Sequence, residues 1–467
     1  MRLDVQWSAP HTTSRLHGSL QMGPGFGFGD WKLAQEKPWY AEGLSALREL
    51  GVDLVRYQGW RNRPDLVVAE PDPPKGGRTS WDFSRVDPPF SDFLQANGGR
   101  PFIMNFSTPP EWLAQDGDPQ AVADYFGRFV SWYAQGGFVD EAGVRHASGH
   151  RARFPYWEVL NEPDLEGEND PAGYVALYDA IVERIHRISP ETRFVGLALA
   201  STLSDPAFST HFLNPRNHRA GVPLDYVSYH FYAQYRPDQS AAEQAAAVFD
   251  QADQFVATLR YIAAIRDELS PSTGILVTEI GAMNQGARQR RAGALADEIQ
   301  LSAAMYAYLY ARMAALGVES AHVSGLVAVQ PDQMWQELAM IEWASGRPNA
   351  RYWVLKLLIH HMGPGARLAL TRNFAPPPYP PPGPVLEMMA RREPVFGQAF
   401  MGADGNRKVL LVNRGAEPAE VVVPGLAGGR LEIVEAARPT DPAQTGPTAS
   451  EGLTLNPFAV AIAALPR

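Results

Sequence analysis

The stretch Tyr156-Trp-Glu-Val-Leu-Asn-Glu-Pro163 decides how the rest of the chain is organised. An apolar run of this length is typical of a buried β-strand, and the proline ends it because proline removes an N–H donor. Glu162 is therefore predicted to lie where a strand emerges from a core, rather than on a solvated helix face. The pattern recurs in Gly274-Ile-Leu-Val-Thr-Glu-Ile280, which predicts a second buried strand with Glu279 at its end.

The surrounding sequence, from residue 17 to residue 363, alternates apolar strand candidates with longer segments of helical periodicity. Such alternation implies parallel strands joined by right-handed crossovers. Eight strands in this length fit a (β/α)₈ TIM barrel, and no Gly-x-Gly-x-x-Gly motif supports an open doubly wound sheet. The predicted strands are His17–Gly23, Val52–Gln58, Arg100–Phe106, Tyr156–Leu160, Arg193–Ala200, Asp225–Phe231, Gly274–Thr278 and His322–Val329. The predicted helices are Trp39–Leu50, Ala121–Ala134, Tyr174–Ile188, Ala241–Leu269, Ala292–Leu316 and Ala350–Met362.

The pattern changes after residue 364. Thr371–Pro384 is rich in proline and is predicted to be loop or polyproline II. Short alternating strands separated by Gly, Pro and Asn turns then predict a small all-β sandwich. Residues 1–16 belong to no barrel element, so the expected accessory domain is 1–16 plus 364–467. Its predicted strands are Val395–Met401, Lys408–Asn413, Glu420–Val423, Arg430–Ala436 and Leu453–Ala464.

Composition narrows the possible partners. The formal net charge of −10 argues against a nucleic-acid partner, because no basic surplus is present to neutralise phosphates. The chain has no cysteine, which excludes disulfides, thiolate nucleophiles and Cys-ligated zinc. No signal peptide is visible and no run reaches membrane-spanning length, so the expected location is the cytoplasm with no membrane partner. The oligomeric state is not predicted.

Two glutamates at the ends of two core strands are the arrangement that glycoside hydrolysis needs. In a TIM barrel the C-terminal ends of the strands point into one shared mouth. One carboxyl group protonates the departing oxygen, and the other either attacks the anomeric carbon or activates water. A separation of about 5–5.5 Å predicts retention of configuration, and about 6.5–9.5 Å predicts inversion. The sequence leaves this separation open.

These motifs resemble clan A of the glycoside hydrolases. Within the clan, Tyr156–Leu165 and Asp225-Tyr-Val-Ser-Tyr-His-Phe-Tyr232 resemble family 39, which includes β-xylosidases and α-L-iduronidases. The resemblance spans the barrel, and a trailing β-sandwich agrees with that family. It implies a retaining double displacement with Glu162 as acid/base and Glu279 as nucleophile, without a metal or other cofactor.

The resemblance also implies roles for the neighbouring side chains. Asn161 is expected to hydrogen-bond the hydroxyl next to the anomeric carbon, and Arg56 to hold the nucleophile ionised. His230 and Tyr232 are expected to orient Glu279 and bind a sugar hydroxyl. Aromatic stacking faces for the sugar are expected from Trp335, after the eighth strand, and from Phe26, Phe28 and Trp31 in the first loop.

The sequence departs from the β-xylosidases of that family after the second strand. Those enzymes carry His-Gly after the arginine, whereas this chain has Arg56-Tyr-Gln-Gly-Trp60 followed by a long polar loop, Arg61–Ser80. This difference lies in the sugar-binding wall and leaves the sugar open.

The first hypothesis is an exo-acting glycosidase on short oligosaccharides. An endo-acting enzyme on an exopolysaccharide and a non-catalytic glycan-binding barrel are the alternatives. A metal-dependent hydrolase has less support, because the sequence shows no His/Asp cluster with ligand spacing. Among the site residues, His230 could instead be a core histidine and Arg56 a barrel-interior ion pair.

Overall fold

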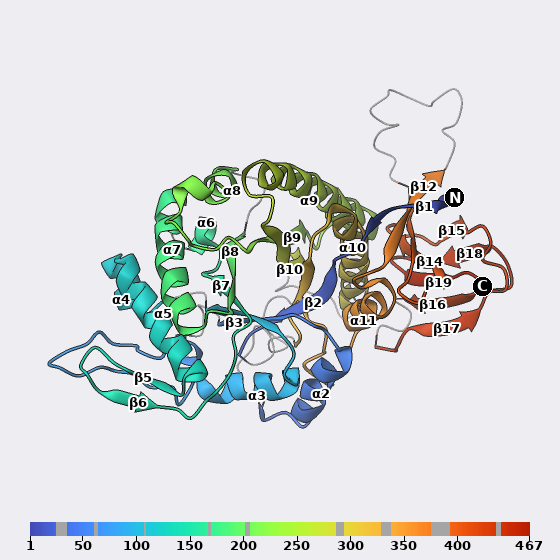
Figure 1. The fold of residues 1–467 in the computed structure, drawn as a ribbon. Helices are drawn as coiled ribbons and strands as arrows, with labels where there is room; N and C mark the ends of the chain where they lie inside the picture. Colours follow the sequence, from blue (N-terminus) through green and yellow to red (C-terminus); the bar gives the residue numbers. More distant parts are fainter. Residues whose placement is uncertain are drawn as a thin grey trace.

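The computed structural model describes residues 1–24, 35–59, 64–106, 109–166, 170–200, 206–285, 294–327, 338–374, 393–435 and 440–467. Eight parallel strands close into a barrel in the order β10-β11-β2-β3-β4-β7-β8-β9, which confirms the predicted TIM barrel (Figure 1). The barrel strands are β2 (His17–Met22), β3 (Val55–Gly59), β4 (Phe102–Phe106), β7 (Tyr156–Val159), β8 (Arg193–Leu199), β9 (Tyr226–Tyr235), β10 (Gly274–Asn284) and β11 (Ser320–Ser324).

Helices surround the barrel and begin where their sequences offer caps. The Asp118 and Asp170 side chains accept backbone N–H bonds at helix N-termini, each followed by a proline at the first helical position. Ser240 and Glu243 form a reciprocal capping box at the start of the longest helix. The helices are α2 (Tyr40–Leu50), α3 (Asp87–Asn97), α4 (Glu111–Asp116), α5 (Pro119–Ala134), α6 (Pro163–Glu166), α7 (Pro171–Ile188), α8 (Ala207–Phe212), α9 (Ala241–Leu269), α10 (Ala294–Leu316) and α11 (Ala350–Met362). The described part of the barrel domain also contains two 3₁₀ turns, Pro64–Leu66 and Pro215–Asn217, and a hairpin of β5 (Gly137–Val139) and β6 (Arg145–Ala147). No helix in the described ranges is long and apolar enough to cross a bilayer.

Two barrel strands differ most from their predicted bounds. β11 covers Ser320–Ser324, whereas the predicted strand is His322–Val329, whose last two residues lie outside the described ranges. β10 continues to Asn284, so Glu279 lies inside the strand instead of ending it. The pairing of β10 with β9 shifts register between Val277 and Glu279. A β-bulge at this point re-aims the following side chain, and periodicity alone does not reveal it.

Among the described residues, nine further strands form the β-sandwich region, in the order β17-β16-β19-β14-β13-β12-β1-β15-β18. β1 pairs with β12 along almost its whole length, which places the N-terminus beside the C-terminal strands (Figure 1). The sequence missed β12 and β17, and the predicted strand Leu453–Ala464 is two strands, because a turn carrying Phe458 at φ 56° interrupts it. The strands are β1 (Arg2–Thr13), β12 (Arg367–Phe374), β13 (Val395–Met401), β14 (Arg407–Asn413), β15 (Ala419–Val422), β16 (Arg430–Val434), β17 (Gln444–Pro447), β18 (Gly452–Leu455) and β19 (Val460–Ala464).

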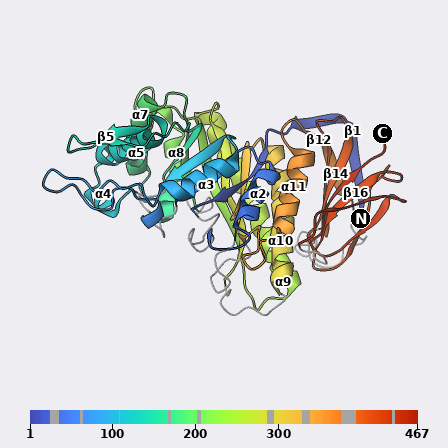
Figure 2. The ribbon, with the colours of Figure 1, turned by 90° about the horizontal axis from the view of Figure 1, so that it is seen from below.

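The sandwich shares a hydrophobic core with the barrel. Alternate side chains of β13, β14 and β19 point in opposite directions, because the side-chain period of a strand is two. One set packs inside the sandwich, and the other set, which includes Phe400, Val412 and Ile462, joins the barrel core. α10 and α11 lie between the barrel and these strands (Figure 2). Gln300 on α10 donates to the carbonyls of Val434 and Phe458 at 3.3 and 2.9 Å, which fixes the orientation of this contact.

Removing the sandwich should therefore unfold or aggregate the barrel. Deletion of residues 1–13 together with 364–467 would expose the apolar faces of α10 and α11 and leave Gln300 without its partners. We expect a large loss of soluble yield and a lower melting temperature, measured by circular dichroism. Deleting only the exposed C-terminal residues 466–467 is the control and should change neither. A soluble, fully active truncated barrel would contradict this dependence.

Part of the loop after β3, which was predicted to be polar, is buried in the structure. Leu66, Val67 and Ala69 are buried, and so is Glu70, whose side chain is 0% exposed. Burial and the negative charge of Glu141 raise the pKa of Glu70 to about 8. The folded protein therefore keeps Glu70 protonated at pH values where the unfolded chain has released the proton.

This difference predicts a stability that falls as pH rises. The raised pKa means that the contribution of Glu70 is complete below about pH 4.5 and is lost as pH rises through about 8. Glu70→Gln should remove this dependence and raise the unfolding free energy at pH 8 by about 2–4 kcal/mol relative to wild type. Denaturant titrations at pH 5 and pH 8 would measure this change, with Glu42→Gln at an exposed position of α2 as the matched control. Parallel pH dependences in wild type and Glu70→Gln would exclude this role for Glu70.

Candidate active site

Glu162 follows β7 at the C-terminal end of the barrel, on a backbone held in an unusual conformation. Leu160 and Glu162 have φ values of 63° and 46°, in the left-handed region that non-glycine residues seldom adopt. The Glu162 N–H donates to the carbonyl of Ala198 on β8 at 3.0 Å, and its own carbonyl accepts from Leu165 at 2.9 Å. These bonds turn the chain sharply, so that α6 can begin at Pro163.

Glu279 lies in the barrel mouth and accepts hydrogen bonds from three strands. Arg56 Nη1 on β3 donates to Glu279 Oε1 at 2.5 Å, and the Tyr232 hydroxyl on β9 donates to Oε2 at 2.5 Å. Gln21 Nε2 on β2 donates at 3.1 Å. The predicted contacts of Arg56 and Tyr232 with this carboxylate are therefore present.

The electrostatic environment keeps Glu279 ionised. Burial alone would raise the pKa of its carboxyl, but the positive charges of His230 and Arg56 and the Tyr232 hydrogen bond hold the pKa below its ordinary value. Arg56 is also fully buried, which would lower its pKa, yet Glu158 and Glu279 raise it. The site therefore contains a charged carboxylate next to a permanently charged guanidinium.

His230 lies between the two glutamates and closer to Glu162. Its Nδ1 is 2.8 Å from Glu162 Oε1 and 3.8 Å from Glu279 Oε1. Burial would lower the pKa of His230, but the negative charges of Glu279 and Glu162 raise it above its ordinary value. The direct hydrogen bond of His230 therefore goes to Glu162, and a longer ion pair reaches Glu279, the carboxylate that His230 was predicted to orient.

The two carboxylates lie close together. One carboxylate oxygen each from Glu162 and Glu279 and one ring nitrogen of His230 lie within 4.8 Å of one another. These three donors could also hold a divalent cation, a cluster that linear spacing hides because the fold assembles it from three strands. A cation there would compete with Arg56, which already neutralises Glu279.

Asn161 is positioned by the same arginine. Arg56 Nη2 donates to Asn161 Oδ1 at 2.7 Å, so the side-chain amino group of Asn161 is left to donate elsewhere. Asn161 is nearly buried, at 4% exposed, and directly precedes Glu162 in the chain. Its position beside both glutamates agrees with the predicted contact to a sugar hydroxyl.

Several buried polar residues of this site were not among the residues predicted from the sequence. Gln58 accepts from both Gln21 and Arg56, and Glu158 accepts from Arg56 Nε at 2.5 Å. A signal for them exists, because residues two apart on a strand face the same side. Arg56 and Gln58 on β3, and Ser228, His230 and Tyr232 on β9, have this spacing. Trp335, Phe26, Phe28 and Trp31 lie outside the described residues, so their predicted stacking roles stay predictions.

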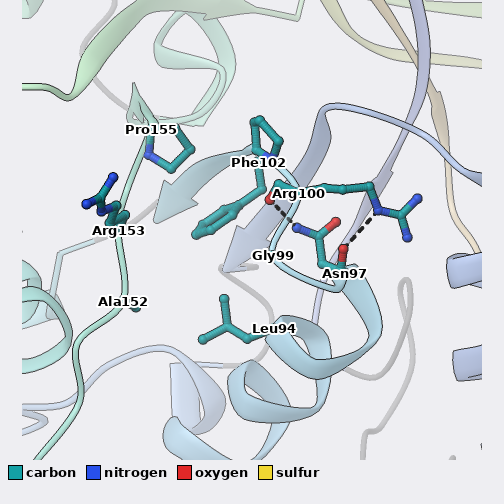
Figure 3. A pocket seen from close by; sticks show the side chains of 9 residues that line it. Leu94, Asn97, Gly99, Arg100, Phe102, Ala152, Arg153 and Pro155 are labelled. Atoms are coloured by element: carbon teal, nitrogen blue, oxygen red, sulfur yellow. Dashed lines mark hydrogen bonds between the residues drawn. The ribbon is translucent and has the colours of Figure 1, made fainter.

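A separate hollow of about 410 Å³ lies at the opposite end of the barrel. Leu94, Phe102 and Pro155 form its apolar walls, next to the N-terminal ends of β4 and β7 (Figure 3). The Arg100 and Arg153 guanidinium groups point away from one another at its rim, and none of the described residues that line it is a carboxylate. It therefore lacks the paired groups found in the mouth.

The barrel, the sandwich and the paired glutamates define a glycoside hydrolase of clan A. The chain belongs to glycosyl hydrolases family 39, whose model matches residues 21–280. Residues 392–463 match the model of the D-apionate lactonase C-terminal immunoglobulin-like domain. No match was found among curated proteins.

Solved structures of clan A enzymes share this fold over the whole chain. The GH51 arabinofuranosidase from Xanthomonas axonopodis pv. citri has 17% identity and a TM-score of 0.65, covering 100% of this chain and 99% of its own. A GH39 beta-xylosidase from Caulobacter crescentus has 16% identity and a TM-score of 0.62, covering 100% of both chains. The catalytic domain of GH30 xylanase C from Talaromyces cellulolyticus has 12% identity and a TM-score of 0.61, covering 100% of both. At these identities the likeness concerns the fold alone.

Proposed function

We propose that this glycoside hydrolase works with retention of configuration and removes single sugars from short oligosaccharides, in the manner of a β-xylosidase. The observation that carries the proposal is the separation of the two carboxylates. Their nearest oxygens lie within 4.8 Å, which agrees with the roughly 5–5.5 Å of retaining enzymes and is shorter than the roughly 6.5–9.5 Å with which inverting enzymes make room for an attacking water.

In the first step, Glu279 attacks the anomeric carbon while Glu162 transfers a proton to the departing oxygen. The bond to the leaving group breaks as the glycosyl–Glu279 ester forms. The lowered pKa of Glu279 supports its role as nucleophile, because only the ionised carboxylate carries the attacking electron pair. The first product leaves as an alcohol.

In the second step, Glu162 accepts a proton from water as that water attacks the same carbon. The ester to Glu279 breaks, and the sugar leaves with its original configuration. Asn161, held by Arg56, donates a hydrogen bond to the hydroxyl next to the anomeric carbon, a contact that strengthens as positive charge develops on the ring.

The finer part of the proposal is exo action. The structural neighbours include a beta-xylosidase and an arabinofuranosidase by name, but also a xylanase. A screen of aryl β-xyloside, α-arabinoside, β-glucoside and α-iduronide would identify the sugar, and product analysis on xylo-oligosaccharides would identify the mode. Monosaccharide release supports the proposal, whereas oligosaccharide products would assign an endo-acting enzyme.

The stereochemical outcome is tested separately by proton NMR during hydrolysis of the aryl glycoside found in the screen. We expect the first detected sugar to carry the anomeric configuration of the substrate. Initial release of the opposite anomer would exclude the double displacement.

A further inference from the structure

Glu158 lies beneath the two active-site glutamates, inside the barrel. Its Oε2 accepts from Arg56 Nε at 2.5 Å and from Asn105 Nδ2 at 2.9 Å. Its Oε1 accepts from the Ser228 hydroxyl at 2.6 Å. All four of these side chains are 0% exposed. A carboxylate at this depth contacts no substrate, so any effect on the reaction passes through its neighbours.

The first connection leads to the proposed nucleophile. Arg56 bonds Glu158 through Nε, Glu279 through Nη1 and Asn161 through Nη2. A guanidinium is a rigid planar fork, so fixing one edge fixes the direction of the others. Glu158 therefore sets the plane in which Arg56 meets Glu279 and Asn161.

The second connection leads to the backbone that carries Glu162. The Ser228 hydroxyl, which donates to Glu158, accepts from the Ala198 N–H at 3.1 Å. The Ala198 carbonyl accepts in turn from the Glu162 N–H at 3.0 Å. On the other side, Asn105 Nδ2 donates to the Leu160 carbonyl at 2.6 Å as well as to Glu158.

The backbone reached by these bonds is strained. Four of the five non-glycine residues with positive φ in the described ranges lie here, and the fifth is Phe458 in the sandwich. Such conformations persist only where surrounding contacts hold them, and they concentrate at functional sites. The four are Leu160 at 63°, Glu162 at 46°, Leu197 at 76° and Ala198 at 47°.

We propose that Glu158 is a positioning residue for both carboxylates, holding Glu279 through Arg56 and Glu162 through Ser228, Asn105 and the strained strand ends. The proposal rests on the roles given to Glu162 and Glu279 above. In this arrangement Ser228 and Asn105 position only Glu162, the proposed acid/base, and Arg56 positions Glu279, the proposed nucleophile.

Ser228 separates the two sides with a matched pair of variants. Ser228→Val and Ser228→Thr add the same methyl group and differ only in the hydroxyl that bonds Glu158 and Ala198. With Val, kcat/KM should fall roughly 10- to 100-fold for the phenyl glycoside of the screened sugar, which needs protonation to depart. For the dinitrophenyl glycoside, a good leaving group, it should fall less than about 3-fold. Ser228→Thr, which keeps the hydroxyl, should retain most of the wild-type kcat/KM for the phenyl glycoside.

Two further variants complete the kinetic test. Glu158→Gln should lower kcat/KM for both substrates by about 100-fold or more, because it disturbs both sides. Ser19→Val removes a hydroxyl that is equally buried in the barrel but bonds the Leu54 carbonyl at 2.6 Å, away from the site. Any change in kcat/KM caused by Ser19→Val should be the same for the phenyl and the dinitrophenyl glycoside. Equal losses on both substrates in Ser228→Val, or no difference between Val and Thr, would overturn the proposal.

Crystal structures of the two Ser228 variants test the geometry without any substrate. In Ser228→Val we expect Glu162 to leave its positive φ and lose its 2.8 Å contact with His230. If Glu162 keeps its φ and its contact with His230 in Ser228→Val, the proposed positioning role is excluded. Failure of the proposed function is distinguishable, because Glu162→Ala and Glu279→Ala would then keep activity in the same assay.

Discussion

Glu279→Ala is expected to lower turnover of every glycoside by on the order of 10⁵-fold, since losing a nucleophile removes the covalent intermediate itself. The variant keeps Arg56, Tyr232 and Gln21, the three donors that contact the carboxylate. The cavity left by the missing carboxylate suits a small anion next to the Arg56 charge. Azide should therefore restore activity on dinitrophenyl glycosides and give a glycosyl azide of inverted configuration.

The control for this loss is a carboxylate outside the mouth. Glu319 directly precedes β11 at the N-terminal end of the barrel and pairs with Arg15 at 3.6 Å. Glu319→Ala should keep turnover within about 2-fold of wild type, because partly exposed pairs contribute little. Wild-type rates in Glu279→Ala, or an azide product of retained configuration, would assign the nucleophile to another residue.

The sequence predicted the barrel and the two glutamates because both depend on local patterns. Buried parallel strands are continuous apolar runs, and all eight appear in the structure near their predicted positions. Glu162 could be placed because Pro163 ends its strand. β12 was missed because Thr371 to Phe374 adjoin a proline-rich segment, and pairing with β1, far away in sequence, stabilises that strand.

The rest of the site depends on register, which no local pattern contains. The bulge before Glu279 shifts its pairing with β9 and decides which side chains reach it. The close spacing of the two carboxylates, within 4.8 Å, follows from barrel closure, because β7 and β10 are not adjacent. Glu158 lies on the same strand as the motif but carries no local signal of a role in the site. Its link to both glutamates emerges only when Arg56, Asn105 and Ser228 meet from three other strands.

Glu162→Ala should affect substrates according to how much their leaving groups need a proton. Phenyl glycosides depart as basic phenolates unless protonated, so kcat/KM should fall about 10³-fold. Dinitrophenyl glycosides leave without help, and their kcat/KM should stay within about 10-fold of wild type. kcat/KM is the proper measure, because it reports the first step only, whereas kcat also includes attack by water.

The second step provides an independent check on the same residue. Without Glu162 no base activates water, so the glycosyl–Glu279 ester should accumulate and kcat should fall even for dinitrophenyl substrates. Azide needs no base, so it should raise kcat and give a glycosyl azide of retained configuration, opposite to the product expected from Glu279→Ala. Trapping of the ester on Glu279 by mass spectrometry would connect the two variants. An equal loss of kcat/KM on both substrates, without azide rescue, would give Glu162 a role in binding rather than in proton transfer.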